Sequence, residues 1–209
     1  MNNFVVAITR TCGSGGMSIG KLLSDYYAID IYDRKLLQLA SEDSGISEEL
    51  FASVDESMKK SMLYRVSRKV YTGELIPPES DDFTSNANLF AYQAKVLKEL
   101  AERESYVVIG RAADYVLKDF KNLIRVYIHA PKEICIEREM KRQGINRREA
   151  AAYVEKMDKY REAYYTYHTG REWKSADNFD LCLDTSKFSY EEAAEMIKSM
   201  IRIRTGNTL

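Results

Sequence analysis

A cluster of glycines near the start of the chain could bind a phosphate group. Three glycines lie within residues 13–16, and four of the ten glycines in the chain lie between positions 13 and 20. They follow a short apolar run, residues 4–8, and precede an apolar stripe with helical spacing that begins at Ile19. The order strand, glycine loop, helix lets backbone N–H groups and the positive end of a helix dipole meet an anion. A tight turn alone would need only one or two glycines, so the pattern favours a phosphate site.

The glycine cluster matches the phosphate-loop pattern G-x-x-x-x-G-K-[ST] in two possible frames. One frame runs from Gly15 to Lys21, but it places Leu22 at the Ser/Thr position and removes Ile19 from the helical stripe. The frame that we prefer places residues 16–18, Gly-Met-Ser, at the G-K-[ST] positions.

The preferred frame leaves the loop without its usual cation. Met17 stands at the lysine position and carries no charge, whereas Ser18 could offer its hydroxyl group to Mg²⁺. Arg10, Lys21 or an arginine from a lid would have to supply the positive charge. We therefore expect ATP and Mg²⁺ as cofactors, bound by Arg10, Gly13, Ser14, Gly15, Gly16, Met17 and Ser18.

Further motifs join the glycine loop in a pattern that spans most of the chain. The sequence resembles the cytidylate kinase-like proteins, which are P-loop relatives of the nucleoside monophosphate kinases. The residues that carry the resemblance are Gly13–Gly20, Tyr32-Asp33-Arg34, Asn88–Gln93, Val108–Asp114, Asp158–Arg161 and Asp180–Ser186. Met17 departs from the pattern, because family members commonly carry arginine there. The phosphate contact expected at that position is therefore lost.

Charged residues that follow two of the apolar runs are candidates for binding the acceptor. Ligands of open α/β sheets lie beyond the carboxyl ends of the strands, and Asp33 with Arg34 follows one such run while Arg111 follows another. The resemblance implies that Arg111 contacts the phosphate of the acceptor and that Asp114 assists it. Asp33 could orient the acceptor or a magnesium-bound water, or it could simply cap the next helix. Asp114 could equally form a surface ion pair.

A second acceptor contact is implied near the middle of a long helical stretch. By resemblance, Arg161 contacts a phosphate or the acceptor, and Asp158 either holds Arg161 or touches the base. The resemblance also implies that the loop at residues 184–186 passes the adenine of ATP through backbone contacts.

Residues 138–150 resemble a lid rich in arginine. Arg138 and Arg142 are four residues apart and hence share a helical face, and Gly144 could serve as a hinge. A lid arginine that closes on the transferring phosphoryl group would neutralise charge and exclude water. The alternative is a solvated charged face, since glutamates are interleaved. We expect Arg138, Arg142, Arg161 and Asp33 to be the catalytic residues.

The elements that must position these residues alternate between strands and helices. Short apolar runs predict buried strands at residues 4–8, 106–109, 124–128 and 180–183, with a weaker one at 29–32, and helical stripes lie between them. This order predicts an α/β fold of three layers with a mostly parallel sheet of about five strands. We expect one domain, residues 1–209, with a helical insertion at residues 41–88 that includes a short helix near 47–60.

Composition narrows the class of protein further. The chain has 209 residues, 45% of them hydrophobic, and a formal net charge of −1. A near-neutral chain is not expected to bind nucleic acid. Its first apolar run is too short for a signal peptide or a membrane span, and three scattered cysteines imply no disulfide framework. We therefore expect a cytoplasmic protein without a membrane partner; the sequence does not determine its oligomeric state.

Together these features predict ATP-dependent phosphoryl transfer to a nucleoside monophosphate, with CMP or dCMP as the acceptor that the resemblance implies. Two alternatives stay open: a kinase for another small acceptor, and a nucleotide-binding protein without transfer activity.

Overall fold

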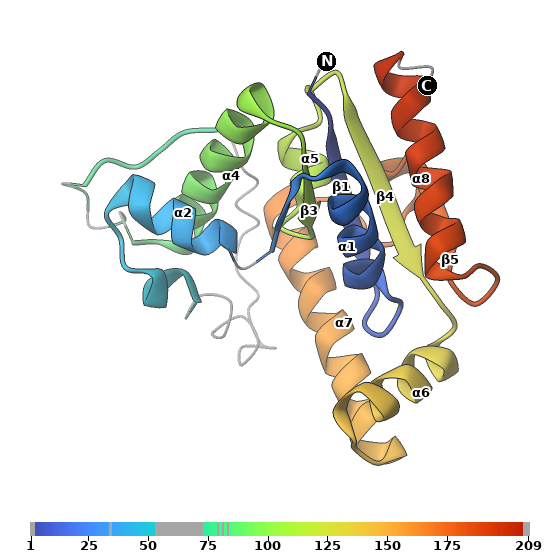
Figure 1. Ribbon diagram of the computed structural model, residues 1–209. Helices are drawn as coiled ribbons and strands as arrows, with labels where there is room; N and C mark the ends of the chain where they lie inside the picture. Colours follow the sequence, from blue (N-terminus) through green and yellow to red (C-terminus); the bar gives the residue numbers. More distant parts are fainter. Residues whose placement is uncertain are drawn as a thin grey trace.

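The computed structural model describes residues 3–33, 35–52, 73–78, 80, 82 and 84–206. Its core is a sheet of five parallel strands in the order β2-β3-β1-β4-β5. The strands are β1 (Val5–Arg10), β2 (Asp30–Tyr32), β3 (Tyr106–Ile109), β4 (Leu123–His129) and β5 (Leu181–Asp184). The sequence-based prediction of an α/β fold with about five strands is confirmed. Because all strands run in one direction, the residues that follow them gather at one edge (Figure 1).

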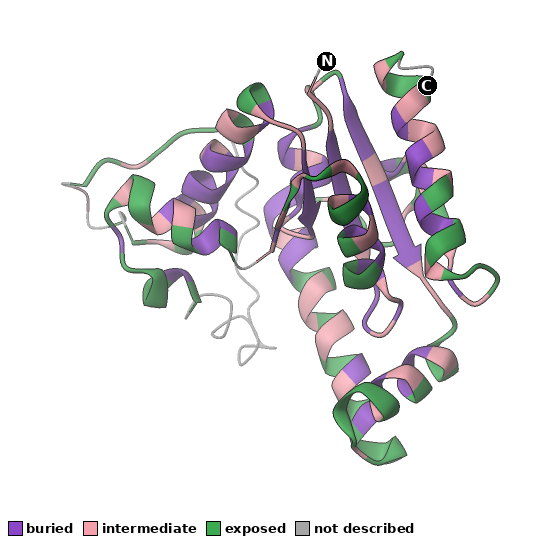
Figure 2. Ribbon diagram, viewed as in Figure 1, coloured by how far each residue is buried: buried purple, intermediate pink, exposed green. Residues whose placement is uncertain are grey.

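Helices cover both faces of the sheet and make the three layers. Alternate residues of each strand point to opposite faces. Val6 and Ile8 of β1 pack with α1 (Gly16–Tyr27) and α8 (Tyr190–Thr205), whereas Val5 and Ala7 pack toward α2 (Lys35–Ser44), α4 (Asn86–Arg103), α5 (Ala113–Val116) and the C-terminal part of α7 (Arg147–Thr169). The three central strands, β1, β3 and β4, are therefore largely buried on both faces, as the purple of β1 and β4 in Figure 2 illustrates. This double cover explains why their sequences are continuously apolar.

The residues expected to form a lid, 138–150, span the end of one helix, a tight turn and the start of the next helix. The helix α6 (Lys132–Gln143) ends at Gly144, which has a φ of 67°, and α7 begins after Asn146. The side chain of Asn146 accepts a hydrogen bond from the backbone N–H of Glu149, and Glu149 reciprocates in a capping box. Gly144 thus interrupts the helix where the sequence predicts it.

The expected insertion at residues 41–88 shares its ends with neighbouring helices. Residues 41–44 belong to α2 and residues 86–88 belong to α4, while residues 48–52 are helical. The remainder of the helix predicted near 47–60 lies outside the described residues. Asn88 binds both backbone polar groups of Ile76, at 2.8 and 3.2 Å, and so fastens the end of this segment to α4.

Candidate active site

The N-terminus of α1 is open toward the carboxyl edge of the sheet. The helix begins at Gly16, so Ile19 lies inside it and is fully buried, as the preferred frame of the loop requires. Gly15 is the N-cap residue with a φ of 89°, and no described side chain caps the helix, whose first turn contains no acidic residue. By contrast, α4, α7 and α8 are capped by Ser85, Asn146 and Ser189. The free N–H groups of α1 therefore fit an anion such as a nucleotide phosphate.

Lys21 does not contribute to this site. Its side chain is 72% exposed and pairs with Asp25 at 3.3 Å along the outer face of α1. Gly20, the glycine before it, is needed for packing, since a Cβ atom there would lie 2.8 Å from the side chain of Ile109. The lysine that completes the other textual frame thus belongs to the helix surface.

The loop itself is held by its own polar groups. The hydroxyl group of Ser14, which is fully buried, donates to the carbonyl oxygens of Thr11 at 2.8 Å and Ile128 at 3.1 Å. Gly13 has a φ of 77°, and a Cβ atom there would meet the backbone of Cys135 at 2.6 Å. Ser14 therefore shapes the loop, and Gly13 allows α6 to approach it closely.

A group of three arginines lies beside the loop, beyond the ends of β1 and β3. The guanidinium group of Arg10 lies over Gly110. A Cβ atom at position 110 would clash with Nη1 of Arg10. Burial lowers the pKa of Arg10 to about 9, with Arg161 and then Arg111 adding to the shift, while Asp33 opposes it. Three guanidinium groups this close to one another favour a bound anion. Arg10 thus borders both sets of predicted residues: its Cβ and Cγ atoms lie against Gly16 of the glycine loop, and its guanidinium group lies toward Arg111 and Arg161.

Arg111 is presented by an unusual turn of the backbone. Three consecutive residues adopt the left-handed conformation: Gly110, Arg111 and Ala112 have φ values of 75°, 60° and 49°. Such a conformation is strained for residues with a Cβ atom. The turn carries Arg111 from the end of β3 into the cavity described below.

Of the two predicted lid arginines, Arg138 is bound to the loop region. Its guanidinium group donates to the hydroxyl group and carbonyl oxygen of Thr185, at 2.8 and 2.7 Å, and lies 3.4 Å from the carbonyl oxygen of Gly13. It also lies over the ring of Tyr190, 5.4 Å from its centroid. The hydroxyl group of Thr185 donates in turn to the carbonyl oxygen of Ser14 at 2.8 Å. Arg138 thus joins α6 to the glycine loop and to the segment after β5.

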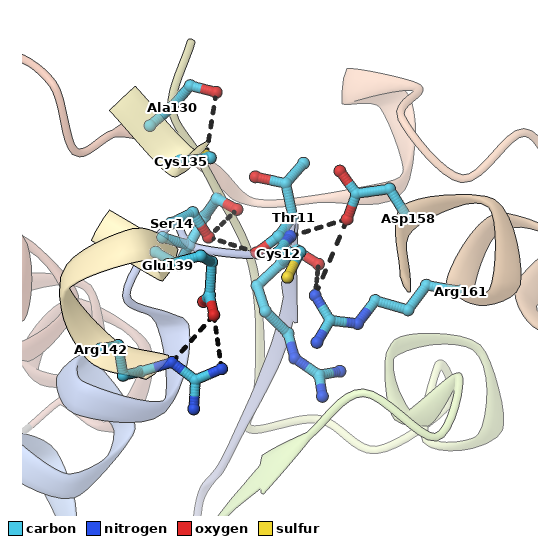
Figure 3. Close-up of polar contacts among 11 residues, drawn as sticks. Thr11, Cys12, Ser14, Ala130, Cys135, Glu139, Arg142, Asp158 and Arg161 are labelled. Atoms are coloured by element: carbon cyan, nitrogen blue, oxygen red, sulfur yellow. Dashed lines mark hydrogen bonds and ion pairs between the residues drawn. The ribbon is translucent and has the colours of Figure 1, made fainter. Parts of the chain in front are cut away.

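Arg142 is paired with a buried carboxylate. Its Nε and Nη2 atoms donate to Oε2 of Glu139 at 3.0 and 2.6 Å (Figure 3). The side-chain amide of Gln143 donates to the same oxygen. The side chain of Glu139 is only 5% exposed, whereas that of Arg142 is 62% exposed. The guanidinium group is therefore partly neutralised by Glu139.

Two predicted acceptor residues do not line the cavity. Asp114 is buried and accepts a hydrogen bond from the hydroxyl group of Tyr165 at 2.6 Å, and burial raises its pKa to about 6. Asp158 accepts a hydrogen bond from the backbone N–H of Cys12 at 2.7 Å. Arg34, predicted beside Asp33, lies outside the described residues.

The remaining candidates meet around one large cavity. Its volume is about 870 Å³, near the upper end of the range for small-molecule sites. Among the described residues that line it are the following predicted ones: Arg10, Gly13, Gly15, Gly16, Met17, Ser18, Asp33, Arg111, Arg138, Arg142 and Arg161. The hydroxyl group of Ser18 and the carboxylate of Asp33 are suited to Mg²⁺, which commonly takes one or two protein ligands beside phosphate and water.

Tyr190 is a cavity residue that the sequence reasoning missed. A Cβ atom on Gly15 would clash with the ring of Tyr190, so the ring lies directly against the N-cap residue of α1. Tyr190 is the first residue of α8, and nothing in the local sequence indicates that its side chain would reach the glycine loop. Glu139 was also missed, because it looked like one of several interleaved surface charges.

Known proteins share both the sequence pattern and the fold. The model of the cytidylate kinase-like family matches residues 5–187. A protein named cytidylate kinase from Methanopyrus kandleri is 24% identical over 206 residues, covering 94% of this chain and 92% of its own; one from Pyrococcus horikoshii is 21% identical, covering 96% and 89%.

Solved structures resemble the whole chain. An uncharacterized protein from Eubacterium ventriosum has a TM-score of 0.71 at 25% identity, covering 97% of this chain and 100% of its own. A shikimate kinase from Bacteroides thetaiotaomicron has a TM-score of 0.52 at 12% identity, covering 95% and 98%, which shows a shared fold. With a family match over most of its length and its glycine loop at the start of α1, the chain belongs to the cytidylate kinase-like family.

Proposed function

We propose that this protein transfers a phosphoryl group from ATP to a nucleoside monophosphate, with CMP or dCMP as the preferred acceptor. The observation that carries the proposal is the joining of two anion sites in one cavity: the open N-terminus of α1, and the arginine group made by Arg10, Arg111 and Arg161. A donor triphosphate and an acceptor phosphate each need such a site. The choice of cytidine rests on the names of the relatives.

The chain's own residues divide between the two nucleotides. Gly13, Gly15, Gly16 and Ser18 would face the donor, and Arg138 would hold the loop in place from the lid. Arg111 and Arg161 would bind the phosphate of the acceptor through charge-assisted hydrogen bonds, with Arg10 beside them. ATP supplies the phosphoryl group and Mg²⁺ offsets its charge. Asp33, at the border of the two sites, would orient the acceptor or a water on Mg²⁺.

Arg142 would act on the transferring group. Its guanidinium group is more than half exposed at the cavity and is held by Glu139, so it could approach the developing negative charge without a large loss of side-chain freedom.

The decisive test is an acceptor panel. We expect ADP to form from Mg·ATP in the presence of CMP or dCMP, with UMP, AMP, shikimate and gluconate much poorer. Replacement of Arg111 in R111A should raise the KM of the acceptor roughly 10- to 100-fold, the size of a lost hydrogen bond to a charged group, and should leave the KM of ATP within about twofold. An equal rise in both values would contradict the placement of Arg111.

A second function is favoured by Met17, which leaves the loop without the cation that usually accompanies transfer. In that case Mg·ATP would raise the melting temperature through binding alone, and no acceptor in the panel would yield ADP.

A further inference from the structure

The entry to the glycine loop is held by a residue far away in the sequence. Within the loop, the N–H of Thr11 donates to Ile128 and that of Ser14 lies 3.4 Å from the carbonyl oxygen of Thr11. The N–H of Cys12, between them, donates to Oδ1 of Asp158 on α7, at 2.7 Å (Figure 3). A carboxylate acceptor makes this a charge-assisted hydrogen bond.

A second contact from the same helix binds the residue at the end of β1. Nη1 of Arg161 donates to the carbonyl oxygen of Arg10 at 3.3 Å, and it lies 3.8 Å from Oδ1 of Asp158. The side chains of Asp158 and Arg161 are 21% and 19% exposed. Two side chains one turn apart on α7 therefore hold the backbone on both sides of Thr11.

The side chain of Cys12 anchors the same point to the lid helices. It is buried with Cys135 and Ile136 of α6 and with Ala150 and Val154 of α7. Burial raises the pKa of Asp158, while the N–H of Cys12 and the charge of Arg161 favour its ionised form. The carboxylate of Asp158 thus accepts a hydrogen bond from the loop backbone. Arg161 lines the cavity, whereas Asp158 is not among its lining residues.

We propose that Asp158 is a positioning residue for the donor loop and makes no contact with the acceptor. It fixes the backbone at Cys12, so that Gly13 to Ser18 present their N–H groups to the donor phosphates in one arrangement. This inference rests on the proposed function, because it assigns Asp158 to one of the two nucleotide sites. It replaces the acceptor contact implied by resemblance.

The first test follows the Cys12 amide and needs no ligand. Labelling with ¹⁵N-cysteine gives three backbone signals, from Cys12, Cys135 and Cys182, which the variants C135S and C182S assign. In D158A we expect the Cys12 signal to move upfield and its hydrogen exchange to accelerate at least tenfold. The variant E162A removes the same charge from an exposed position on α7 and should leave the signal in place. A Cys12 signal that is unchanged in D158A overturns the proposal.

The second test separates donor from acceptor. In D158A the Kd of Mg·ATP should rise about tenfold while the Kd of CMP stays within twofold. In D158N the Kd of Mg·ATP should rise no more than threefold, because the amide oxygen still accepts from Cys12. Weaker CMP binding with unchanged ATP binding, or an equal loss of both, overturns the proposal.

The tests also remain decisive if D158A does not fold or if the unmodified protein binds no nucleotide. If D158A does not fold, D158N carries the test: the Cys12 signal should move upfield because a neutral oxygen is a weaker acceptor, and an unchanged signal overturns the proposal. If the unmodified protein binds neither ATP nor CMP, the proposed function fails, and the Cys12 signal still reports separately whether Asp158 holds the loop.

Discussion

Met17 lies at the rim of the donor loop with 43% of its surface exposed. It occupies the second position of α1, where a side chain can reach a phosphate bound at the helix N-terminus. Of the other predicted cations, Arg138 is bound to Thr185 and Arg142 to Glu139, whereas Lys21 lies on the outer surface. Arg10 lies beside the loop, with its guanidinium group near Arg111 and Arg161. Position 17 itself therefore adds no positive charge to the loop.

Restoring a cation at position 17 should strengthen donor binding. We expect M17K and M17R to lower the Kd of Mg·ATP about tenfold, near the lower end of what a charge-assisted hydrogen bond contributes because the site is partly exposed. The neutral variant M17Q should change it by less than threefold, and K21A should leave it unchanged. Isothermal titration calorimetry measures all four. Loss of ATP binding in K21A would show that the other frame of the loop is the functional one.

At the scale of elements, the residues that end the helices differ in how well they suit a left-handed backbone conformation. The helices α6, α7 and α8 each end at a glycine with positive φ: Gly144, Gly170 and Gly206. The helix α1 instead ends at Ala28, which is exposed and has a φ of 52° and a ψ of 47°. A Cβ atom in the left-handed region costs free energy that glycine avoids.

The variant A28G should therefore stabilise the protein. We expect the free energy of unfolding to rise by about 1 kcal/mol, because relief of the strain exceeds the entropy that glycine adds to the unfolded chain. The matched control is A152G, at an exposed position inside α7, which should lower the same free energy by about 1 kcal/mol. Urea denaturation of both variants measures the two values, and equal signs would contradict the argument.

The elements that could be predicted from the sequence are those with local causes. The five strands follow from short apolar runs, and the end of α6 follows from Gly144. The role of Asp158 could not be predicted, since its partner Cys12 lies 146 positions away. The ring of Tyr190 over Gly15 likewise depends on how α8 packs against α1. Spacing within one element says nothing of such contacts.

At the scale of the whole molecule, two buried titratable side chains, His168 and Asp114, change the pH dependence of stability in opposite directions. His168 is 2% exposed and stacked on Phe90 with ring centroids 3.9 Å apart. Burial lowers its pKa to about 3. Burial raises the pKa of Asp114 to about 6. The neutral forms of both groups are favoured in the folded protein, so acidification removes stability through His168 and adds some through Asp114.

Among the described helices, none combines the length and apolar character needed to cross a membrane.

The contribution of His168 can be isolated by its pH dependence. Its folded pKa lies below the unfolded value of about 6.5, so the stabilising contribution is complete above pH 6.5 and is lost as the pH falls toward 3. Between pH 4 and 6 the unfolded state binds one more proton, which adds about 1.4 kcal/mol per pH unit to the slope of the unfolding free energy. We expect H168Q to lack this part of the slope while D114N keeps it. Parallel slopes for H168Q and the unmodified protein would show that His168 is protonated when folded.

The arginine group formed by Arg10, Arg111 and Arg161 would also respond to the phosphate in the surrounding solution. Guanidinium groups select for charge and shape, and inorganic phosphate has the same charge and shape as the terminal group of a nucleotide. Wherever orthophosphate is abundant, it would compete for the acceptor's place and at the same time stabilise the folded chain by mass action. Under the proposed function, the apparent affinity for the acceptor nucleotide would therefore fall as the concentration of phosphate in the surrounding solution rises.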